Sequence, residues 1–471
     1  MALNGRIDLL ANHNAVSNPN YGITGQGEAF IYDQATDPTT GVVSAGANSV
    51  TRVLPEYAST LKVVGTELAL KSQVNMQGLA IYLGAGAVVH APNANVTLSA
   101  GVWDVLTGTG NTDIDFVHAS GQVYLDQNAV IDVAGSTGIA SSISQYVIEV
   151  DLRAAELADV PLQRNSSLRG QTVTVDLRET GTRADGSTWY GTPLANLTGY
   201  LGVIERNAGE LTTKGGNVSI SAGDSVVMQQ GSRINTAGGY QEFAAGTVNT
   251  TRLIDDGNLV DIARADPSVV YDGIYNPVTT TTDSRWGVTT TTSSSTDTSR
   301  FENSHLFGAA AGNVSISAAA MALDGGFAAG TVAGPQQLNA APKAGSLTLQ
   351  WQSQLLSRAI PEFPFISPTP PAITFTSTAS TLPASDTFAL DGSGKPLALR
   401  AERRAAVELA SSLLSQQAFG SLFVNNGAGD ITLPSGVSLR APVGGTVSLH
   451  GANVNVQGSI SAPAGLIDLI A

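Results

Sequence analysis

Cysteine is absent from this chain of 471 residues. Its absence excludes disulfide bridges, thiolate metal sites and cysteine nucleophiles. Basic residues are also scarce: Lys and Arg number 23 against 38 Asp and Glu, which gives a formal net charge of −15. Nucleic-acid binding needs Lys and Arg gathered on one face, and the longest basic cluster is Arg403-Arg404. Nucleic acid is therefore not an expected partner.

Long hydrophobic runs are missing as well. The longest mostly apolar stretch is Gly78–Ala91, which is shorter than the roughly 20 residues that a membrane-spanning helix needs. The first residues, MALNGRIDLLANHN, do not place a basic region before an apolar one, so they do not resemble a signal peptide. We expect no membrane insertion and no export signal within this sequence.

The sequence does contain a repeated strand pattern. Gly216–Ala222 (Gly-Asn-Val-Ser-Ile-Ser-Ala) recurs unchanged as Gly312–Ala318. Apolar and polar residues alternate in both copies, which places Val and Ile on one face of a strand and Ser on the other. Ile220 and Ile316 are therefore expected to face inward and Ser219 outward. Looser copies begin at Asn95, Gly121, Gly345, Gly429 and Gly445.

The spacing of the last copies indicates a fold. Gly429, Gly445 and Gly465 follow one another after 16 and 20 residues, and three short strands with three turns in about 20 residues are typical of one coil of a parallel β-helix. Like charges would stack on one another in such a fold, and charged residues are only 13% of this chain. We predict an all-β chain that forms a right-handed parallel β-helix, a solenoid with long insertions. A β-sandwich is the alternative.

The two ends of the sequence are similar, because Gly5–Ala11 and Gly465–Ala471 share Ile, Asp, Leu and Ala in register. Terminal repeats usually carry a polar cap, and neither end shows one. We therefore expect a piece of a longer solenoid, with a chance match of a short motif as the alternative.

Departures from the strand pattern divide the chain into coils and insertions. The predicted coils are residues 1–135, with an irregular stretch at 12–65, and residues 215–239, 312–350 and 429–471. The predicted insertions are residues 136–214, 240–311 and 351–428.

The first insertion contains two Val-Asp-Leu-Arg tetrapeptides, Val150–Arg153 and Val175–Arg178. We expect Asp151 and Arg153 to lie beside Asp176 and Arg178 on neighbouring strands. This arrangement would form either a charged groove for a polar ligand or a ladder of ion pairs, which contributes little to stability.

The second insertion contains two threonine runs, Thr279–Thr282 and Thr289–Thr292, on either side of a turn-rich segment. This pattern predicts a projecting hairpin with Trp286 near its tip; a flexible Ser/Thr linker is the alternative. Trp286, Tyr271 and Tyr275 are candidate ligand-binding residues, because exposed aromatic rings anchor many interfaces. Alternatively, these rings fold back into a small separate core.

The third insertion begins with the prolines at 361, 364, 368, 370 and 371, which favour an extended stretch. Its later part predicts an α-helix over Pro396–Phe419, since Ala406, Leu409 and Leu413 share one helical face and Arg404 and Glu408 are spaced for an ion pair.

The sequence contains no Gly-x-Ser-x-Gly, His-Glu-x-x-His, Walker or Gly-x-Gly-x-x-Gly motif. The five histidines (His13, His90, His118, His305 and His450) are too far apart for a local metal site. We therefore predict no enzyme activity, no metal and no cofactor. The alternative is a polysaccharide-degrading β-helix enzyme with its site near Asp151, Asp176 and Glu179.

Residues 215–224 and 232–239 resemble the filamentous haemagglutinin-type exoproteins of the two-partner secretion route. Residues 150–163, 168–170 and 194–216 resemble an uncharacterised region of very large members of this family. The resemblance covers about 66–240 and, more generally, the closing coils; the two later insertions do not match it.

This resemblance implies a non-catalytic segment of a large secreted or surface-anchored bacterial adhesin or filament. A secretion partner in the outer membrane would act on an upstream domain outside this sequence, and the ligand would be a host-cell surface or a glycan. The protein would then be extracellular or on the bacterial cell surface. A purely structural stalk, with recognition elsewhere in the parent chain, is a further alternative.

Overall fold

The computed structural model describes residues 5–13, 15–17, 30–32, 41–68, 70–107, 112–276, 278–293, 299–338, 341–351, 369–378, 380–415 and 418–471. Residues 361–368 of the predicted proline-rich stretch lie outside this range. No helix among the described residues is long and apolar enough to span a membrane.

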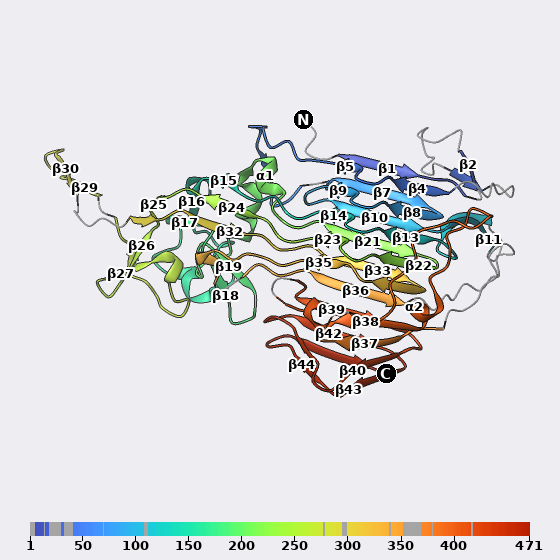
Figure 1. Ribbon diagram of the computed structural model, residues 1–471. Helices are drawn as coiled ribbons and strands as arrows, with labels where there is room; N and C mark the ends of the chain where they lie inside the picture. Colours follow the sequence, from blue (N-terminus) through green and yellow to red (C-terminus); the bar gives the residue numbers. More distant parts are fainter. Residues whose placement is uncertain are drawn as a thin grey trace.

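The repeated strand pattern forms one sheet of nine parallel strands. The two identical heptapeptides lie side by side in it: Val218 is paired with Val314 and Ile220 with Ile316. The order of the strands in this sheet follows the sequence (Figure 1): β1 (Arg6–Leu10), β7 (Gln73–Gly78), β10 (Asn95–Ala100), β21 (Asn217–Ala222), β33 (Val314–Ala318), β36 (Ser346–Trp351), β39 (Ser421–Asn425), β42 (Thr446–His450) and β45 (Leu466–Ile470).

Two further parallel sheets of five strands accompany the nine-stranded sheet. The chain visits the three sheets in turn, so that β7, β8 and β9 belong to the first, second and third sheet and β10 returns to the first. The second sheet contains β4 (Val42–Ala45), β8 (Ala80–Leu83), β13 (Gln122–Leu125), β22 (Ser225–Met228) and β34 (Ala320–Leu323). The third contains β5 (Val50–Arg52), β9 (Val88–His90), β14 (Val130–Asp132), β23 (Arg233–Asn235) and β35 (Gly326–Ala328).

Smaller parallel sheets take the corresponding places at the C-terminal end. One contains β38 (Ala406–Ala410), β37 (Ala372–Thr376), β40 (Asp430–Leu433) and β43 (Asn453–Val456), and the other contains β41 (Ser438–Arg440) and β44 (Ser459–Ser461). We call all of these parallel sheets together the sheet body. A predominantly β chain with large parallel sheets, as the sequence predicts, is confirmed.

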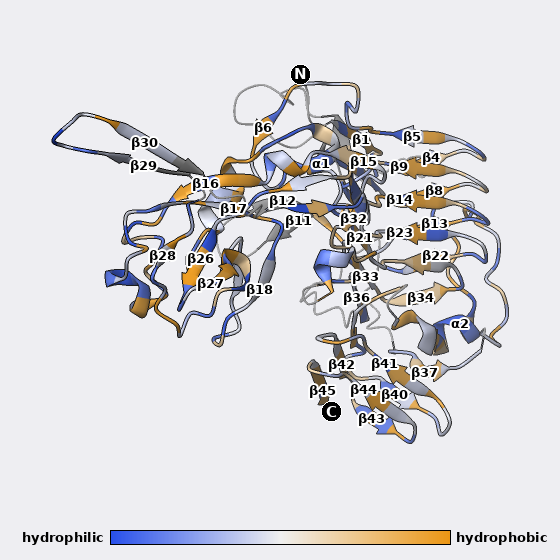
Figure 2. Cartoon of the chain, turned by 90° about the vertical axis from the view of Figure 1, so that its left-hand side faces the viewer, coloured by the Kyte–Doolittle hydropathy of each residue, from blue (hydrophilic) through white to orange (hydrophobic). Residues whose placement is uncertain are grey.

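A continuous apolar core runs through the sheet body. Val218, Ile220, Val314 and Ile316 are at most 1% exposed, whereas Ser219 is exposed, which confirms the predicted facing. In Figure 2 hydrophobic colouring recurs from strand to strand in the second sheet, from β4 to β34. The alternation of side chains along each strand thus becomes a ladder of buried apolar residues between strands.

The turns between the second and third sheets alternate Asn and Gly along the column. Asn48, Gly86, Asn128 and Gly231 all have positive φ, between 57° and 82°. A Cβ added at Gly86 would lie 2.6 Å from Oδ1 of Asn48, and one at Gly231 would lie 2.5 Å from Oδ1 of Asn128. Glycine is required at these two positions both for the backbone conformation and for the space beside each asparagine.

The predicted helix over 396–419 is wrong. The helix α2 spans only Ala401–Ala405, and the chain continues directly as strand β38, which pairs with β37 in parallel. Val407 and Leu409 are buried there, so the segment follows the period of a strand, and tertiary pairing overrides its local helix propensity. The predicted ion pair between Arg404 and Glu408 also does not form, because Arg404 instead forms an ion pair with Asp224.

The insertions 136–214 and 240–311 fold together into one unit, the lateral lobe, at the side of the sheet body (Figure 1). Residues from Ile143 to Ile204 and from Phe243 to Tyr271 share an apolar core separate from that of the sheet body. The lobe contains β15 (Ile139–Ser141), β16 (Val147–Asp151), β17 (Thr172–Asp176), β18 (Thr180–Thr182), β19 (Thr188–Tyr190), β20 (Glu205–Arg206), α1 (Ala208–Leu211), β24 (Tyr240–Phe243), β25 (Gly246–Val248), β26 (Arg252–Asp255), β27 (Asn258–Asp261), β28 (Gly273–Ile274), β29 (Val278–Thr282), β30 (Thr289–Ser293), β31 (Arg300–Glu302) and β32 (His305–Gly308).

A second projection leaves the sheet body between β10 and β13. It is an antiparallel hairpin of β11 (Val102–Thr107) and β12 (Thr112–Val117), which the sequence pattern did not predict. The N-terminal part adds β2 (Ala15–Ser17), β3 (Phe30–Tyr32) and β6 (Val63–Val64). Strand β6 pairs with β20 of the lateral lobe.

Candidate functional site

The two Val-Asp-Leu-Arg tetrapeptides lie at opposite ends of one antiparallel ribbon. Strand β16 pairs with β17 so that Val147 faces Asp176 and Asp151 faces Thr172. The expectation that Asp151 and Arg153 lie beside Asp176 and Arg178 is therefore wrong. An antiparallel register separates them, although the sequence repeat suggested equivalent neighbouring strands.

The Asp151 end of the ribbon is exposed to solvent. Arg153 Nη2 donates to Asp151 Oδ2 at 2.8 Å, and the Thr172 hydroxyl donates to Oδ1 at 2.7 Å. These two hydrogen bonds, from Thr172 and then Arg153, hold the pKa of Asp151 below its ordinary value. An open hollow of about 360 Å³ lies here, lined by Glu149, Val150, Asp151, Arg153, Glu156, Thr172 and Tyr200.

The Asp176 end is buried and fully paired. The Asp176 side chain is 0% exposed and that of Arg178 is 1% exposed. Arg178 Nη2 lies 2.5 Å from Asp176 Oδ2, and Arg178 Nε and its backbone N–H both donate to Oδ1 at 3.0 Å. Such a bidentate pair is the strongest arrangement between an arginine and a carboxylate.

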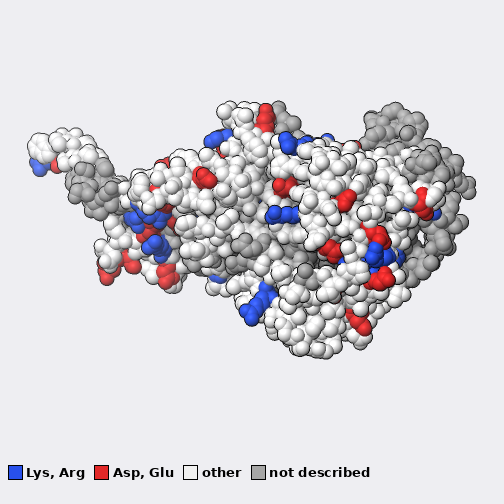
Figure 3. Space-filling view, in the orientation of Figure 1, with Lys and Arg blue, Asp and Glu red and all other residues white. Residues whose placement is uncertain are grey.

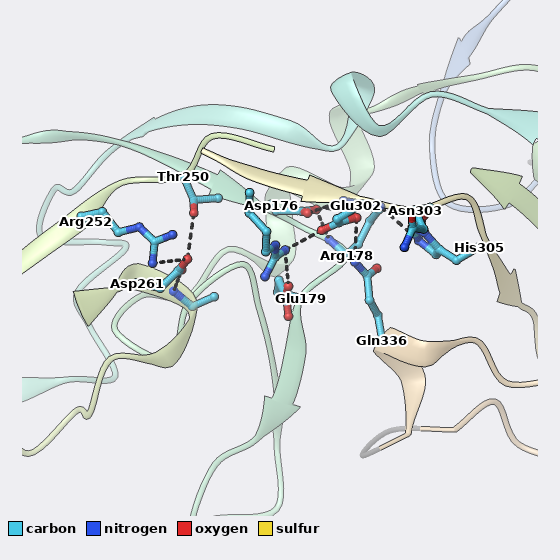
Figure 4. A network of polar contacts seen from close by, with 12 residues as sticks. Asp176, Arg178, Glu179, Thr250, Arg252, Asp261, Glu302, Asn303, His305 and Gln336 are labelled. Carbon is cyan, nitrogen blue, oxygen red and sulfur yellow. Dashed lines mark hydrogen bonds and ion pairs between the residues drawn. The ribbon is translucent and has the colours of Figure 1, made fainter. Parts of the chain in front are cut away.

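Strand β31, more than 100 residues further along the chain, completes this buried network (Figure 4). Arg178 Nη2 also donates to Glu302 Oε2 at 3.0 Å. Arg300 Nη2 donates both to Glu302 Oε1 at 2.5 Å and to Glu179 Oε1 at 2.8 Å. Burial acts to lower the pKa of Arg178, but hydrogen bonds and attraction from Asp176 and Glu302 outweigh it and raise that pKa. The network therefore ties the first insertion to the second.

Aromatic residues enclose the guanidinium of Arg178. Its Cζ lies 5.0 Å from the centre of the Phe243 ring, and His305 stacks on the same ring at 5.4 Å. His305 Nε2 is 3.3 Å from Arg178 Nη1, and its Nδ1 is 3.0 Å from the carbonyl oxygen of Asn303. An arginine donates at Nη1, so Nε2 accepts and the proton of the ring lies on Nδ1.

Three carboxylates of this network come close enough together to hold a cation. Oxygens of Asp176, Glu179 and Glu302 lie within 4.8 Å of one another. Each carboxylate already accepts hydrogen bonds from Arg178 or Arg300, so the charges of the two arginines offset two of the three carboxylate charges. Asp151 lies at the far end of the ribbon, so the three carboxylates suggested for a polysaccharide-degrading site do not form one site.

The predicted hairpin is present and projects from the far end of the lateral lobe (Figures 1 and 2). Strand β29 pairs with β30 in antiparallel register, with Thr282 opposite Thr289. At the tip, Asp283 Oδ1 accepts hydrogen bonds from the backbone N–H groups of Arg285 at 2.8 Å and Trp286 at 3.2 Å. The alternative of an unstructured linker is therefore wrong.

Trp286 is the exposed aromatic residue of this tip. Its side chain is 71% exposed, and the guanidinium of Arg285 lies over the indole, 5.3 Å from the ring centre. The described side chains of both strands around it are exposed threonines. The tip thus exposes the aromatic ring of Trp286 and the cation of Arg285 at the end of a hairpin of threonines.

The two candidate tyrosines are not part of this surface. Tyr271 is 2% exposed and belongs to the core of the lateral lobe, and its hydroxyl accepts a hydrogen bond from the backbone N–H of Asp266 at 2.7 Å. Tyr275 is half-buried. The expectation that these rings are exposed is wrong for Tyr271, which folds back into a separate core as the alternative predicted.

Sequence reasoning did not find Arg300 and Glu302 as members of the buried network. They flank Phe301 on β31, and this alternation predicts that both side chains point to one face of a strand. Nothing local indicates that Arg178, 124 residues away, is the partner of Glu302.

Comparisons with family models, with curated proteins and with solved structures gave no significant match.

Proposed function

We propose that the sheet body is a right-handed parallel β-helix that serves as the shaft of a large bacterial surface or secreted protein of the filamentous haemagglutinin type. Successive strands of the chain belong to the first, second and third parallel sheet in turn, and this order supports a helical path of the chain. Identical heptapeptides paired in register also support it, because each coil then repeats the core of the preceding one.

The β29–β30 hairpin is the contact element of this shaft. The observation that carries the proposal is Trp286, which is 71% exposed at the end of a projection although the sheet body and the lateral lobe each have an apolar core in which an indole could be buried. Exposed tryptophans stack on the apolar faces of sugars and anchor protein interfaces. The ligand class is therefore a glycan or a protein on a host-cell surface.

Neither catalysis nor nucleic-acid binding is part of this proposal. The carboxylates suggested for catalysis are divided between an exposed ion pair and a buried network in which Asp176 and Glu179 are bonded to arginines. On the face seen in Figure 3, charged side chains are scattered and most of the surface is uncharged. The net charge of −15 also opposes association with phosphates. Secretion to the cell surface through an outer-membrane partner rests on the resemblance of residues 215–239.

The experiment compares binding of the purified protein to cultured epithelial cells and to a glycan array before and after the change Trp286→Ala. Leu338→Ala is the matched control, because Leu338 is 77% exposed but lies outside the hairpin. We expect Trp286→Ala to reduce binding at least about tenfold, as interface hot spots do, and Leu338→Ala to leave it unchanged. Binding that is equal in all three proteins would favour the structural stalk and refute the contact role.

A further inference from the structure

A cavity of about 290 Å³ lies where the lateral lobe joins the sheet body. Its walls are largely apolar and include the rings of Tyr146, Tyr190, Phe243 and Phe307. Other lining residues belong to the connections between lobe and body, namely Thr213–Lys214 before β21 and Ala309–Ala310 before β33. An apolar cavity of this size with a few converging polar groups is typical of a site for a small ligand.

The decisive polar group is Arg206, which lines the cavity and is only 7% exposed. Its Nη1 donates to the carbonyl oxygens of Gly65, of Leu201 at 3.0 Å and of Ile204 at 3.4 Å. Its guanidinium also lies 5.6 Å from the centre of the Tyr146 ring. These contacts fix the position of the group but supply no negative charge.

Among the described residues, no carboxylate forms an ion pair with Arg206. Arg178, in contrast, is paired with both Asp176 and Glu302. Glu210, which also lines the cavity, is occupied by other donors: the Ser141 hydroxyl at 2.7 Å, Gln145 Nε2 at 2.6 Å and the backbone N–H of Asn207 at 2.9 Å. A buried charge without a counter-ion is costly, so Arg206 would gain from an anion in the cavity.

The cavity also offers a second cation. Lys214 lines it and forms an ion pair with Glu67, whose Oε2 is 3.9 Å from Nζ, with both side chains about half exposed. Such a pair is weak. Of the four charged residues that line the cavity, three are cationic and only Arg178 among them is neutralised by close, buried carboxylates.

We propose that this cavity binds a small aromatic carboxylate. The carboxylate bonds Nε and Nη2 of Arg206, because a guanidinium and a carboxylate fit each other in a two-point arrangement. The described residues bond Arg206 through Nη1 and leave these two donors available. The aromatic ring packs among Tyr146, Tyr190, Phe243 and Phe307, and Lys214 adds attraction at the cavity. This site is independent of the hairpin and of the proposed contact role.

The test uses naphthoate as the probe and naphthamide as its neutral analogue, with binding to the full chain measured by titration calorimetry. The wild-type protein should bind naphthoate saturably and at least about tenfold more tightly than naphthamide, because a hydrogen bond to a charged group contributes about 1.5–3 kcal/mol. Equal affinity for the two compounds, or no saturable binding of naphthoate, would overturn the proposal without any variant.

Variants then locate the site. Arg206→Lys keeps the charge but loses the two-point contact, and Lys214→Gln removes the second cation; we expect naphthoate affinity to fall at least about tenfold and a few-fold, respectively. Arg440→Gln is the charge-matched control, because Arg440 is exposed on β41 in the C-terminal two-stranded sheet. Equal weakening by Arg440→Gln and Lys214→Gln would show general charge attraction and refute the site. If Arg206→Lys does not fold, the proposal is still tested by Lys214→Gln and by the difference in affinity between naphthoate and naphthamide.

Discussion

In the sheet body, residues that touch across neighbouring strands are equivalents in a repeat, whereas in the lateral lobe the contacting residues are unrelated in sequence. Val218 lies beside Val314 and Ile220 beside Ile316, but Arg178 lies beside Asp176 and Glu302. Repetition lets the body build its core from apolar residues that alternate with polar ones along each strand. The Val-Asp-Leu-Arg repeat of the lobe does not place its two copies in equivalent positions. The lobe also buries specific charged groups, whose partners must all be present. A single substitution should therefore have different consequences in the two regions.

The largest expected effect is the loss of one partner in the buried network of the lobe. Arg178→Met leaves Asp176 buried without its cation, and breaking a buried pair in this way costs about 3–5 kcal/mol. Hydrogen exchange measured by mass spectrometry should show lost protection in β16 and β17, with β21 and β33 unchanged.

The second tetrapeptide supplies the matched control for that experiment. Arg153 pairs with Asp151 in the same local sequence, but its side chain is 74% exposed, so Arg153→Met should change protection little. Equal effects of Arg153→Met and Arg178→Met would contradict the assignment of one pair to the interior and the other to the surface.

The next effect concerns the apolar ladder of the sheet body. Ile220 and Ile316 are 0% exposed, so truncation of either to alanine should cost about 2–5 kcal/mol. Ser219→Ala on the outer face should cost little. Denaturant midpoints of the three variants measure this, and a loss for Ser219→Ala equal to that for Ile220→Ala would refute the facing of the strand.

A smaller loss of stability is expected from substituting a turn glycine. This loss should differ between Gly231 in the body, which lies against Asn128, and Gly257 in the lobe, which has no such neighbour. Gly231 and Gly257 have nearly the same φ, 82° and 80°, but only Gly231 has a neighbour, Asn128, that a Cβ would meet. Gly257→Ala should cost about 1–2 kcal/mol from backbone strain alone. Gly231→Ala should cost measurably more in the same denaturation experiment. Equal losses of unfolding free energy in the two variants would show that Asn128 moves aside without a measurable cost.

The two regions also differ in how much of their structure could be predicted from the sequence. The facing of Ile220 and Ser219 could be predicted because a two-residue period encodes it directly. The segment around Val407 and Leu409 could not, because its apolar residues fit both a helix and a strand, and only pairing with β37 decides between them. The partners of Arg178, and the lack of a carboxylate partner for Arg206 among the described residues, depend on tertiary contacts that leave no local pattern. The hairpin could be predicted because threonine runs and a turn lie next to each other in sequence.

The smallest effect is that of a polar contact on the outside of the sheet body. Tyr82 donates to Asp126 Oδ2 at 2.7 Å and stacks on Phe388 at 4.6 Å. The hydrogen bond to Asp126, with burial, raises the pKa of Tyr82 from 10.0 to about 12. A raised pKa in the folded protein stabilises it fully below pH 10.0, and this contribution disappears as the pH rises through about 12.

Unfolding free energies of wild type and Tyr82→Phe, measured across this pH range, test that contribution. The difference between the two proteins should be largest below pH 10.0 and should shrink toward pH 12. A difference that stays constant with pH would mean that Tyr82 does not act through its proton.

In the proposed function the sheet body is the structural support and the hairpin of the lateral lobe contacts the ligand. Deletion of residues 278–292, which removes both threonine runs and Trp286, tests it most directly in one thermal melt and one cell-binding assay. We expect the thermal transition of the sheet body to be nearly unchanged, because no described side chain of the hairpin belongs to either apolar core, and we expect binding to be lost. Binding that survives the deletion, or melting of the whole protein with it, would contradict the claim.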